Sequence, residues 1–305
     1  MARPLPPVLA STTALLQQLR ELYGKTPRTV SFEFFPPQSV AAETRLWQVI
    51  DTLAPLNPGF VSVTYGAGGT TRTRTHATVM RIKRETRLVP AAHLTCINAS
   101  RDEIDAIARD YWAAGVRNLV ALRGDLPPGS VRTHLEDGYL YADALVAGLK
   151  KIADFNISVA AYPESHPEAR SADDDIDHLK RKLDAGASRA ITQFFFDVDV
   201  YLRFVERCRA RGIHTEIIPG ILPVTNVGQL KKFAAQCGTH VPAWLASLFD
   251  GLDENPELRH SIAAMVAAEQ CRMLMLAGVD NFHFYTLNRA DLTQAICHIL
   301  GVRAT

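Results

Sequence analysis

The amino-acid sequence predicts a (β/α)8 barrel, and three observations carry this prediction. Eight short runs rich in β-branched and aromatic residues recur along the 305 residues. Stretches with helical spacing lie between them, and most runs start about thirty residues apart, the length of one βα unit. No GxGxxG motif follows the first run, which counts against a doubly wound sheet, the competing architecture.

The predicted strands lie at residues 29–36, 60–66, 91–97, 118–124, 157–163, 190–196, 215–222 and 281–288. A barrel of this class has about 250 residues, so the chain contains more residues than the barrel itself needs. The largest excess lies between the seventh and eighth strands, over residues 226–279, where we expect about two additional helices.

Helical spacing follows the first, third, fifth and sixth strands, at residues 42–56, 100–115, 171–186 and 199–212. Several of these helices end in Ala-Gly or Arg-Gly, as expected of a glycine C-cap. No compositional break marks a linker. We therefore expect one barrel domain over residues 1–305, with a short N-terminal helical extension over about residues 1–27 and no regulatory domain.

Composition excludes several classes of protein. With 47% hydrophobic residues and a net charge of +1, the chain has no basic block that would bind nucleic acid or an anionic membrane. No run of apolar residues is long enough to span a membrane. The five cysteines are scattered without a CxxC pair, which indicates reduced thiols in a cytoplasmic protein and no zinc or iron–sulfur ligand set.

Polar residues gather near the C-terminal ends of the predicted strands, where a barrel carries its chemistry. They are Glu33, Thr64, Tyr65, His93, Arg123, Gly124, Asp125, Tyr162, His166, Gln193, Asn288 and Arg289. Each one alone has an ordinary structural explanation, such as a buried acid bonded to an arginine or a glycine in a turn. Their convergence on one rim predicts a binding pocket.

The absence of certain residue types from this rim limits the reactions that the pocket could catalyse. No strand end offers a lysine for a Schiff base, and neither GxSxG nor a cysteine nucleophile appears. His93, Asp125 and His166 are candidate metal ligands without HxH or HExxH spacing. A metal-dependent barrel lyase or hydrolase using these three residues is therefore one candidate function, and a non-catalytic binding protein on the same fold is another.

Nine motifs together resemble the methylenetetrahydrofolate reductase family in its short bacterial form. In chain order they are SFEFFPP, VTYGAGGT, HLTC, RGD, YPESHPEA, KRKLDAGA, ITQFFFD, IIPGILP and FHFYTLNR. The resemblance implies a barrel that binds FAD non-covalently and reduces 5,10-methylenetetrahydrofolate to 5-methyltetrahydrofolate. It implies NADH as the co-substrate, with NADPH as the alternative, in a ping-pong reaction that supplies methyl groups for methionine synthesis. A cytoplasmic homo-oligomer with small-molecule partners is expected.

The resemblance also implies site residues. Glu33 matches the catalytic general acid and Asp125 a second catalytic carboxylate. The cofactor-binding positions are Thr64, Tyr65, Ala67, His93, Arg123, Gly124, Asp125, Ala142, Tyr162, His166, Ala169, Asp175, His178, Arg181 and Lys182. The substrate-binding positions are Thr64, Asp125, Gln193, Gln229, Phe233 and Arg289.

The implied chemistry explains why a strand would bury an acid. The substrate must open its five-membered ring to an N5 iminium, and N10 needs a proton as it leaves, which a protonated acid supplies. Strand alternation places Ser31, Glu33 and Phe35 on one face of the first strand. We expect Glu33 to face the barrel mouth, in a dry site that raises its pKa. An ionised Asp125 would stabilise the iminium.

Overall fold

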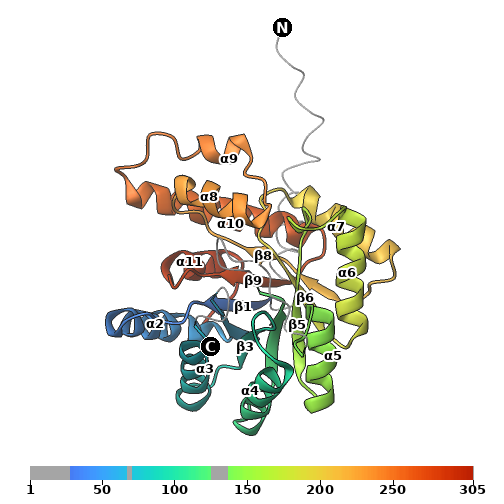
Figure 1. The fold of residues 1–305 in the computed structure, drawn as a ribbon. Coiled ribbons are helices and arrows are strands. Elements are labelled where there is room, and N and C mark those ends of the chain that lie inside the picture. Colours follow the sequence, from blue (N-terminus) through green and yellow to red (C-terminus); the bar gives the residue numbers. More distant parts are fainter. Residues whose placement is uncertain (1–27, 67–70, 125–136, 305) are drawn as a thin grey trace.

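The computed structural model of the protein describes residues 28–66, 71–124 and 137–304. In these residues nine parallel strands form one sheet, in the order β7-β6-β5-β4-β3-β2-β1-β9-β8 (Figure 1). Their bounds are β1 Thr29–Phe34, β2 Phe60–Val63, β3 Pro90–Thr95, β4 Asn118–Leu122, β5 Asn156–Ala161, β6 Arg189–Thr192, β7 Glu216–Ile218, β8 Gly220–Ile221 and β9 Asn281–Tyr285.

The seventh predicted strand is present in two pieces. β7 pairs with β6, through Arg189 and Glu216, and β8 pairs with β9, through Gly220 and His283. Only Pro219 separates the two pieces, and proline has no N–H to donate to a neighbouring strand. The two halves of one strand thus join both ends of the sheet, and the predicted (β/α)8 barrel is confirmed.

Helices alternate with the strands and surround them (Figure 1). The outer ring consists of α2 Val40–Leu53, α3 Arg72–Glu85, α4 Arg101–Ala113, α5 Ala142–Ile152, α6 Ala172–Asp184, α7 Val198–Ala210, α10 Pro256–Leu276 and α11 Asp291–Ile299. A short 3-10 helix, Ala54–Leu56, extends α2. Two further helices, α8 Val227–Cys237 and α9 Ala243–Ser247, precede α10, which confirms the two additional helices expected there.

Side chains that cap helix N-termini determine where several of these helices begin. Ser100 and Glu103 form a reciprocal capping box at the start of α4. The Ser171 hydroxyl accepts a hydrogen bond from the Asp174 N–H at the start of α6. Asn226 caps α8 in the same way, by accepting from the Gln229 N–H.

The main hydrophobic core lies between the strands and the outer helices. It includes Phe32 and Phe34 of β1, both essentially inaccessible to solvent. Ser31 and Glu33 alternate with them and face the barrel interior, as the sequence pattern predicts. In the described residues no helix is long and apolar enough to cross a membrane.

Candidate active site

Two adjoining cavities open near the C-terminal ends of the strands. The first, about 220 Å³, is lined by Glu33, His93, Gln193, Phe233 and Tyr285 among mostly apolar residues, and we call it the carboxylate cavity. The second, about 280 Å³, is lined by Arg123, His166, His178, Arg181 and Lys182, and we call it the cationic cavity. Tyr162 lines both, so one elongated ligand could occupy the two together.

Glu33 stands at the centre of a buried polar network. Its Oε2 lies 3.2 Å from His93 Nε2 and 3.6 Å from His283 Nε2. The Ser62 hydroxyl donates to the same oxygen over 3.5 Å. Behind His283, its Nδ1 lies 2.8 Å from the Ser31 hydroxyl oxygen. Three strands, β2, β3 and β9, therefore bring polar groups to the carboxylate of β1 inside the barrel.

The expectation of a raised pKa for Glu33 is wrong. Burial raises the pKa of this carboxyl, but the contacts and positive charges of His283 and His93 outweigh burial and lower the pKa to about 2. The contacts of the carboxylate with His283 and His93 contribute most to this lowering, and the charges of the two rings contribute less. Glu33 is ionised near neutral pH.

His283 is a member of this network that the sequence motifs did not single out. Its side chain is fully buried, and its ring stacks on Phe60 with centroids 5.6 Å apart. The pairing of β1 with β9 places His283 beside Ser31 and Tyr285 beside Glu33. If the register between β1 and β9 were known, strand alternation would place His283 and Tyr285 next to Glu33. The register cannot be predicted from the sequence of one strand alone.

An aromatic wall and an amide complete the carboxylate cavity. Phe233 of α8 stacks on Phe194 at 5.2 Å between centroids, with 43% of Phe233 still exposed. The Gln193 side-chain oxygen accepts a hydrogen bond from the Phe194 N–H over 3.0 Å. Tyr285 donates through its hydroxyl to the Thr192 carbonyl over 2.7 Å. The cavity thus offers flat apolar surface with few polar groups, as is typical of ring-binding sites.

The rim beside Glu33 is held by the end of β9. Asn288, which has a left-handed backbone at φ 55°, accepts a hydrogen bond from the Phe35 N–H and donates one to the Phe35 carbonyl. The Thr286 hydroxyl donates to the Glu33 carbonyl over 2.6 Å. These contacts join the first and last strands where the cavity opens, and so fix the backbone on either side of Glu33.

The cationic cavity is lined by three cationic side chains, Arg123, Arg181 and Lys182, together with three carboxylates, Asp143, Glu168 and Asp175. Lys182 Nζ donates to the Ala160 carbonyl over 2.6 Å. Burial lowers the pKa of Lys182 to about 8, against the opposing charges of Asp175 and Asp143. Arg181 lies 3.6 Å from an Asp143 oxygen. The guanidinium groups and the ammonium group could each turn from these carboxylates to an anionic ligand.

The loop after β5 fixes the ring of His166. Its backbone N–H donates to Asp175 Oδ2 over 2.9 Å, and its Nδ1 accepts from the Glu168 N–H over 3.0 Å. In the neutral ring the proton must therefore sit on Nε2, which makes that atom a donor. The same loop places Glu168 against Arg123 with two hydrogen bonds, of 2.6 and 3.0 Å. Glu168 was not among the predicted site residues.

The structure brings most of the predicted residues together. Those that line one of the two cavities are Glu33, His93, Arg123, Ala142, Tyr162, His166, Ala169, Asp175, His178, Arg181, Lys182, Gln193 and Phe233. Thr64, Tyr65, Gly124, Gln229 and Arg289 line neither cavity. Ala67 and Asp125 lie outside the described residues.

Two of the residues that line neither cavity make other contacts. The Tyr65 hydroxyl accepts a hydrogen bond from Arg72 Nε over 2.8 Å. Gln229 is exposed, and its backbone N–H donates a hydrogen bond to the Asn226 side chain that caps α8.

The candidate metal ligands do not meet within the described residues. His93 lines the carboxylate cavity and His166 the cationic cavity. Across residues 28–66, 71–124 and 137–304, no group of three or more histidine, cysteine or acidic side chains is arranged to hold a metal ion.

The two cavities lie at the C-terminal ends of the strands, where enzymes with this barrel fold carry their active sites. Residues 17–301 match the sequence profile described as methylenetetrahydrofolate reductase. The chain belongs to the methylenetetrahydrofolate reductase family and is therefore an oxidoreductase, which confirms the family predicted from the motifs.

Named relatives agree with this assignment. The chain is 57% identical over 290 residues to 5,10-methylenetetrahydrofolate reductase of Escherichia coli, with 95% of this chain and 96% of that one covered. The enzyme of the same name from Buchnera aphidicola subsp. Acyrthosiphon pisum is 48% identical, at 89% and 91% coverage. Methylenetetrahydrofolate reductase (NADH) 1 of Arabidopsis thaliana is 36% identical, with 94% of this chain but 51% of the plant protein covered.

Among solved structures, a Clostridium thermocellum protein has the same fold. It is described as an uncharacterized protein that binds two copies of 5-methyl-5,6,7,8-tetrahydrofolic acid. The TM-score is 0.60 at 13% identity, with 94% of this chain and 98% of that one covered. At this identity the likeness shows the fold alone.

Proposed function

We propose that the protein reduces 5,10-methylenetetrahydrofolate to 5-methyltetrahydrofolate with bound FAD, in a ping-pong reaction. Family membership and the names of the relatives support the folate substrate and product. NADH is the co-substrate we propose first, since the plant relative carries it in its name, and NADPH is the alternative. The product would supply methyl groups for methionine synthesis. The single observation that carries the proposal is the buried Glu33 carboxylate, 3.2 Å from His93 Nε2, inside an apolar cavity that adjoins the cationic cavity.

The cationic cavity fits the anionic part of FAD. Arg123, Arg181 and Lys182 supply positive charge, and His166 Nε2 supplies a donor. Ala142 and Ala169 leave space between these groups. When bound, FAD would accept a hydride from the reduced nicotinamide and pass it to the folate. We assign the remaining predicted cofactor positions, including Thr64, Tyr65 and Gly124, to this role by family resemblance.

The carboxylate cavity fits the pterin ring of the folate. Phe233 and Phe194 offer a flat apolar wall, and the Gln193 carboxamide carries both a donor and an acceptor for the ring edge. Gln229 and Arg289, which lie outside the cavity, would contact the rest of the substrate. Thr64 and Asp125 keep the substrate-binding roles that the resemblance implies, and Asp125 also keeps its catalytic role.

Glu33 delivers the proton that folate N10 needs. In the free protein Glu33 is ionised, and His93 Nε2 lies 3.2 Å from its Oε2. A folate that fills the cavity excludes water and so favours the neutral carboxyl group. Glu33 then takes up a proton as the folate binds and passes it to N10. His283 Nε2 lies 3.6 Å from the same carboxylate oxygen, and the contact of its Nδ1 with the Ser31 hydroxyl fixes the position of this ring.

An anaerobic visible spectrum tests the function. Protein reconstituted with FAD should lose its yellow colour when NADH is added and recover it when 5,10-methylenetetrahydrofolate follows, with 5-methyltetrahydrofolate as the product. Bleaching without recovery would keep the flavoprotein but remove the folate substrate.

Two other outcomes correspond to the alternatives. A protein that binds FAD or folate without turnover would be the non-catalytic binder. Colourless protein that takes up no FAD, and that acquires activity only with a divalent metal, would be the lyase or hydrolase using His93, Asp125 and His166.

A further inference from the structure

Two buried polar side chains from different elements meet the segment that follows β6. Thr239 lies between α8 and α9 and is 8% exposed, and Gln270 lies on α10 and is 7% exposed. Burying a hydroxyl or a carboxamide costs free energy unless the group forms hydrogen bonds. The hydrogen-bond partners of these two residues therefore show what they support.

The backbone that follows β6 leaves the sheet. β6 ends at Thr192, and its pairing with β5 ends there too. The Gln193 N–H still donates to the Ala161 carbonyl over 2.7 Å. Phe194 and Phe195 come next and are buried, although they belong to no strand. Their carbonyl groups need hydrogen-bond donors from within the protein.

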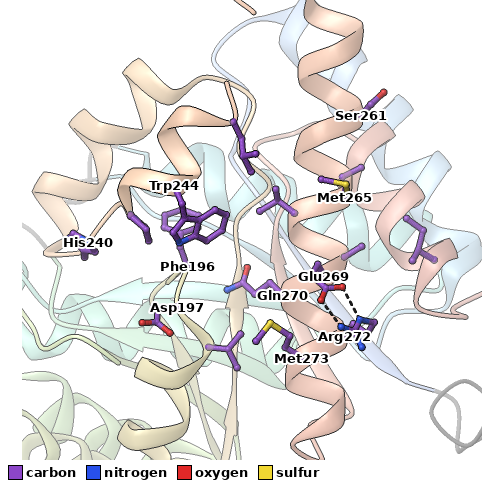
Figure 2. Close-up of a pocket in the computed structure, with 17 residues that line it drawn as sticks. Phe196, Asp197, His240, Trp244, Ser261, Met265, Glu269, Gln270, Arg272 and Met273 are labelled. Atoms are coloured by element: carbon purple, nitrogen blue, oxygen red, sulfur yellow. Dashed lines mark hydrogen bonds and ion pairs between the residues drawn. The ribbon is translucent and has the colours of Figure 1, made fainter. Parts of the chain in front are cut away.

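Thr239 and Gln270 supply these donors. The Thr239 hydroxyl donates to the Phe194 carbonyl over 3.1 Å. Gln270 Nε2 donates to the Phe195 carbonyl over 2.6 Å. Figure 2 shows Gln270 extending from α10 toward the segment that carries Phe196. Two consecutive peptide groups are thus held by side chains in place of a neighbouring strand.

The same stretch of backbone orients the carboxamide of Gln193. The Phe194 N–H donates to Gln193 Oε1 over 3.0 Å, so this oxygen is turned toward the backbone. Gln193 lines the carboxylate cavity, and across residues 28–66, 71–124 and 137–304 no hydrogen bond engages its Nε2. Both N–H groups of Nε2 are therefore left for a ligand, which must offer an acceptor, as the carbonyl group of a pterin ring does.

Packing alone does not require a carboxamide at position 270. Ala267 and Leu274, one turn away on either side, belong to the main hydrophobic core. An apolar side chain at position 270 would fill the same space without the cost of desolvating a polar group. It would leave the Phe195 carbonyl without its donor, and an unpaired buried carbonyl is costly. The contact with Phe195 is thus what distinguishes Gln270 from an apolar residue.

We propose that Gln270 and Thr239 are positioning residues for folate binding. They hold the backbone after β6 so that Gln193 presents its N–H groups to the ring edge of the folate. Neither residue lines the carboxylate cavity, so both act through the Phe194–Phe195 backbone. This inference rests on the proposed folate substrate.

Isothermal titration calorimetry tests the inference, with 5-methyltetrahydrofolate added to protein reconstituted with FAD. Gln270→Met removes the donor and keeps the length of the side chain. Its Kd for the folate should rise about tenfold, because the released segment must be drawn back before Gln193 can meet the ligand. Its affinity for FAD should not change, since the segment does not line the cationic cavity.

A second pair of variants tests the other contact. Thr239→Val removes the hydroxyl at constant shape and should also raise the Kd for the folate, by about fivefold to tenfold. Thr239→Ser keeps the hydroxyl and should stay within about twofold of the wild type. Equal losses in Thr239→Val and Thr239→Ser would show that the hydrogen bond to Phe194 is not what matters.

A double-mutant cycle separates positioning from a general loss of structure. In a Gln193→Ala background no carboxamide remains to be oriented, so Gln270→Met should weaken folate binding by less than about twofold. Damage to the fold as a whole would keep its full effect in that background. Ser261→Ala is the matched control on α10, because this hydroxyl donates to the Glu257 carbonyl of the same helix. It should bind folate as the wild type does.

The outcomes separate this inference from the proposed function. If the wild type binds the folate and Gln270→Met binds it equally well, the inference is overturned and the proposed function stands. A full tenfold loss in the Gln193→Ala background would also overturn it and make Gln270 a structural residue. A wild type that binds no folate would overturn both.

Discussion

Glu33 shows how a buried carboxyl group can be held ionised. Burial by itself would favour the protonated form. The apolar neighbours of Glu33 in the sequence FEFF therefore predict a raised pKa. The two imidazoles lower the pKa of Glu33 instead, because His93 and His283 both place Nε2 within 3.6 Å of Oε2. One of them comes from a strand 250 residues further along the chain. No property of the first strand predicts that neighbour.

The ionised state of Glu33 predicts how stability depends on pH. Its pKa falls from 4.5 to about 2 on folding, so its stabilisation is fully present above about pH 4.5 and is lost as the pH falls to about 2. Over this window the gap in unfolding free energy between the wild type and Glu33→Gln should shrink by about 3 kcal/mol. Urea denaturation of both proteins measures it. A gap that widens as the pH falls would mean that the pKa of Glu33 is raised.

Lys182 predicts a pH dependence of FAD binding. Its pKa of about 8 means that the free protein loses this charge as the pH rises through 8. Affinity for FAD should therefore be level below pH 8 and fall above it, by up to about tenfold per pH unit. Flavin fluorescence on titration with protein reports the affinity. Lys182→Met should bind more weakly and lose the decline.

Lys180→Met on the same helix serves as the control, because Lys180 is paired with Asp184 outside the cationic cavity. It should keep the wild-type profile. A decline in affinity that persists in Lys182→Met would assign the titrating group to another residue.

At the scale of the element, the split seventh strand is the feature that the active site depends on. A Cβ at Gly220 would lie 2.2 Å from the Thr192 carbonyl oxygen and 2.5 Å from the Tyr285 ring. That carbonyl accepts the Tyr285 hydroxyl, and Thr192 immediately precedes Gln193. The close approach of β8 to β6 and β9 therefore requires glycine at this position.

Gly220→Ala should lower the unfolding free energy by about 3 kcal/mol. The added Cβ would clash with the backbone carbonyl of Thr192, which cannot rotate away as a side chain can. Gly228→Ala in α8 is the control, as its Cβ would meet only Asn226 Oδ1 at 3.4 Å. That change should be neutral or stabilising. Urea denaturation compares the two. Equal effects would show that β8 can shift to make room.

Strand ends show where reading the sequence reaches its limit. The run 190–196 predicts one strand, yet β6 ends at Thr192 and the three phenylalanines continue as a loop. Phe194 and Phe196 pack into a separate core with α8, α9 and α10, whereas Phe195 joins the main core. An apolar run identifies buried residues, but it does not tell a strand from a loop that is equally buried.

At the scale of the whole molecule, periodicity was sufficient for the architecture. Eight βα units at even spacing predict a closed barrel, and closure brings the strand ends to one rim without further information. For this reason six residues expected at the strand ends line the two cavities: Glu33, His93, Arg123, Tyr162, His166 and Gln193. The other seven predicted residues that line them were implied by the family resemblance. The predicted positions that line neither cavity came from both lines of reasoning, and several lie next to residues 67–70 and 125–136 or on the added helix α8.

The measurement that tests the central claim is the pair of anaerobic half-reactions of Glu33→Gln, followed by stopped-flow absorbance. Flavin reduction by NADH should stay within a few-fold of the wild type. Reoxidation by 5,10-methylenetetrahydrofolate should slow at least about 100-fold, because the acid that protonates N10 has been removed. If both half-reactions fell together, Glu33 would be a structural residue. If folate reduction survived unchanged, the carboxylate cavity would not be the site of the chemistry.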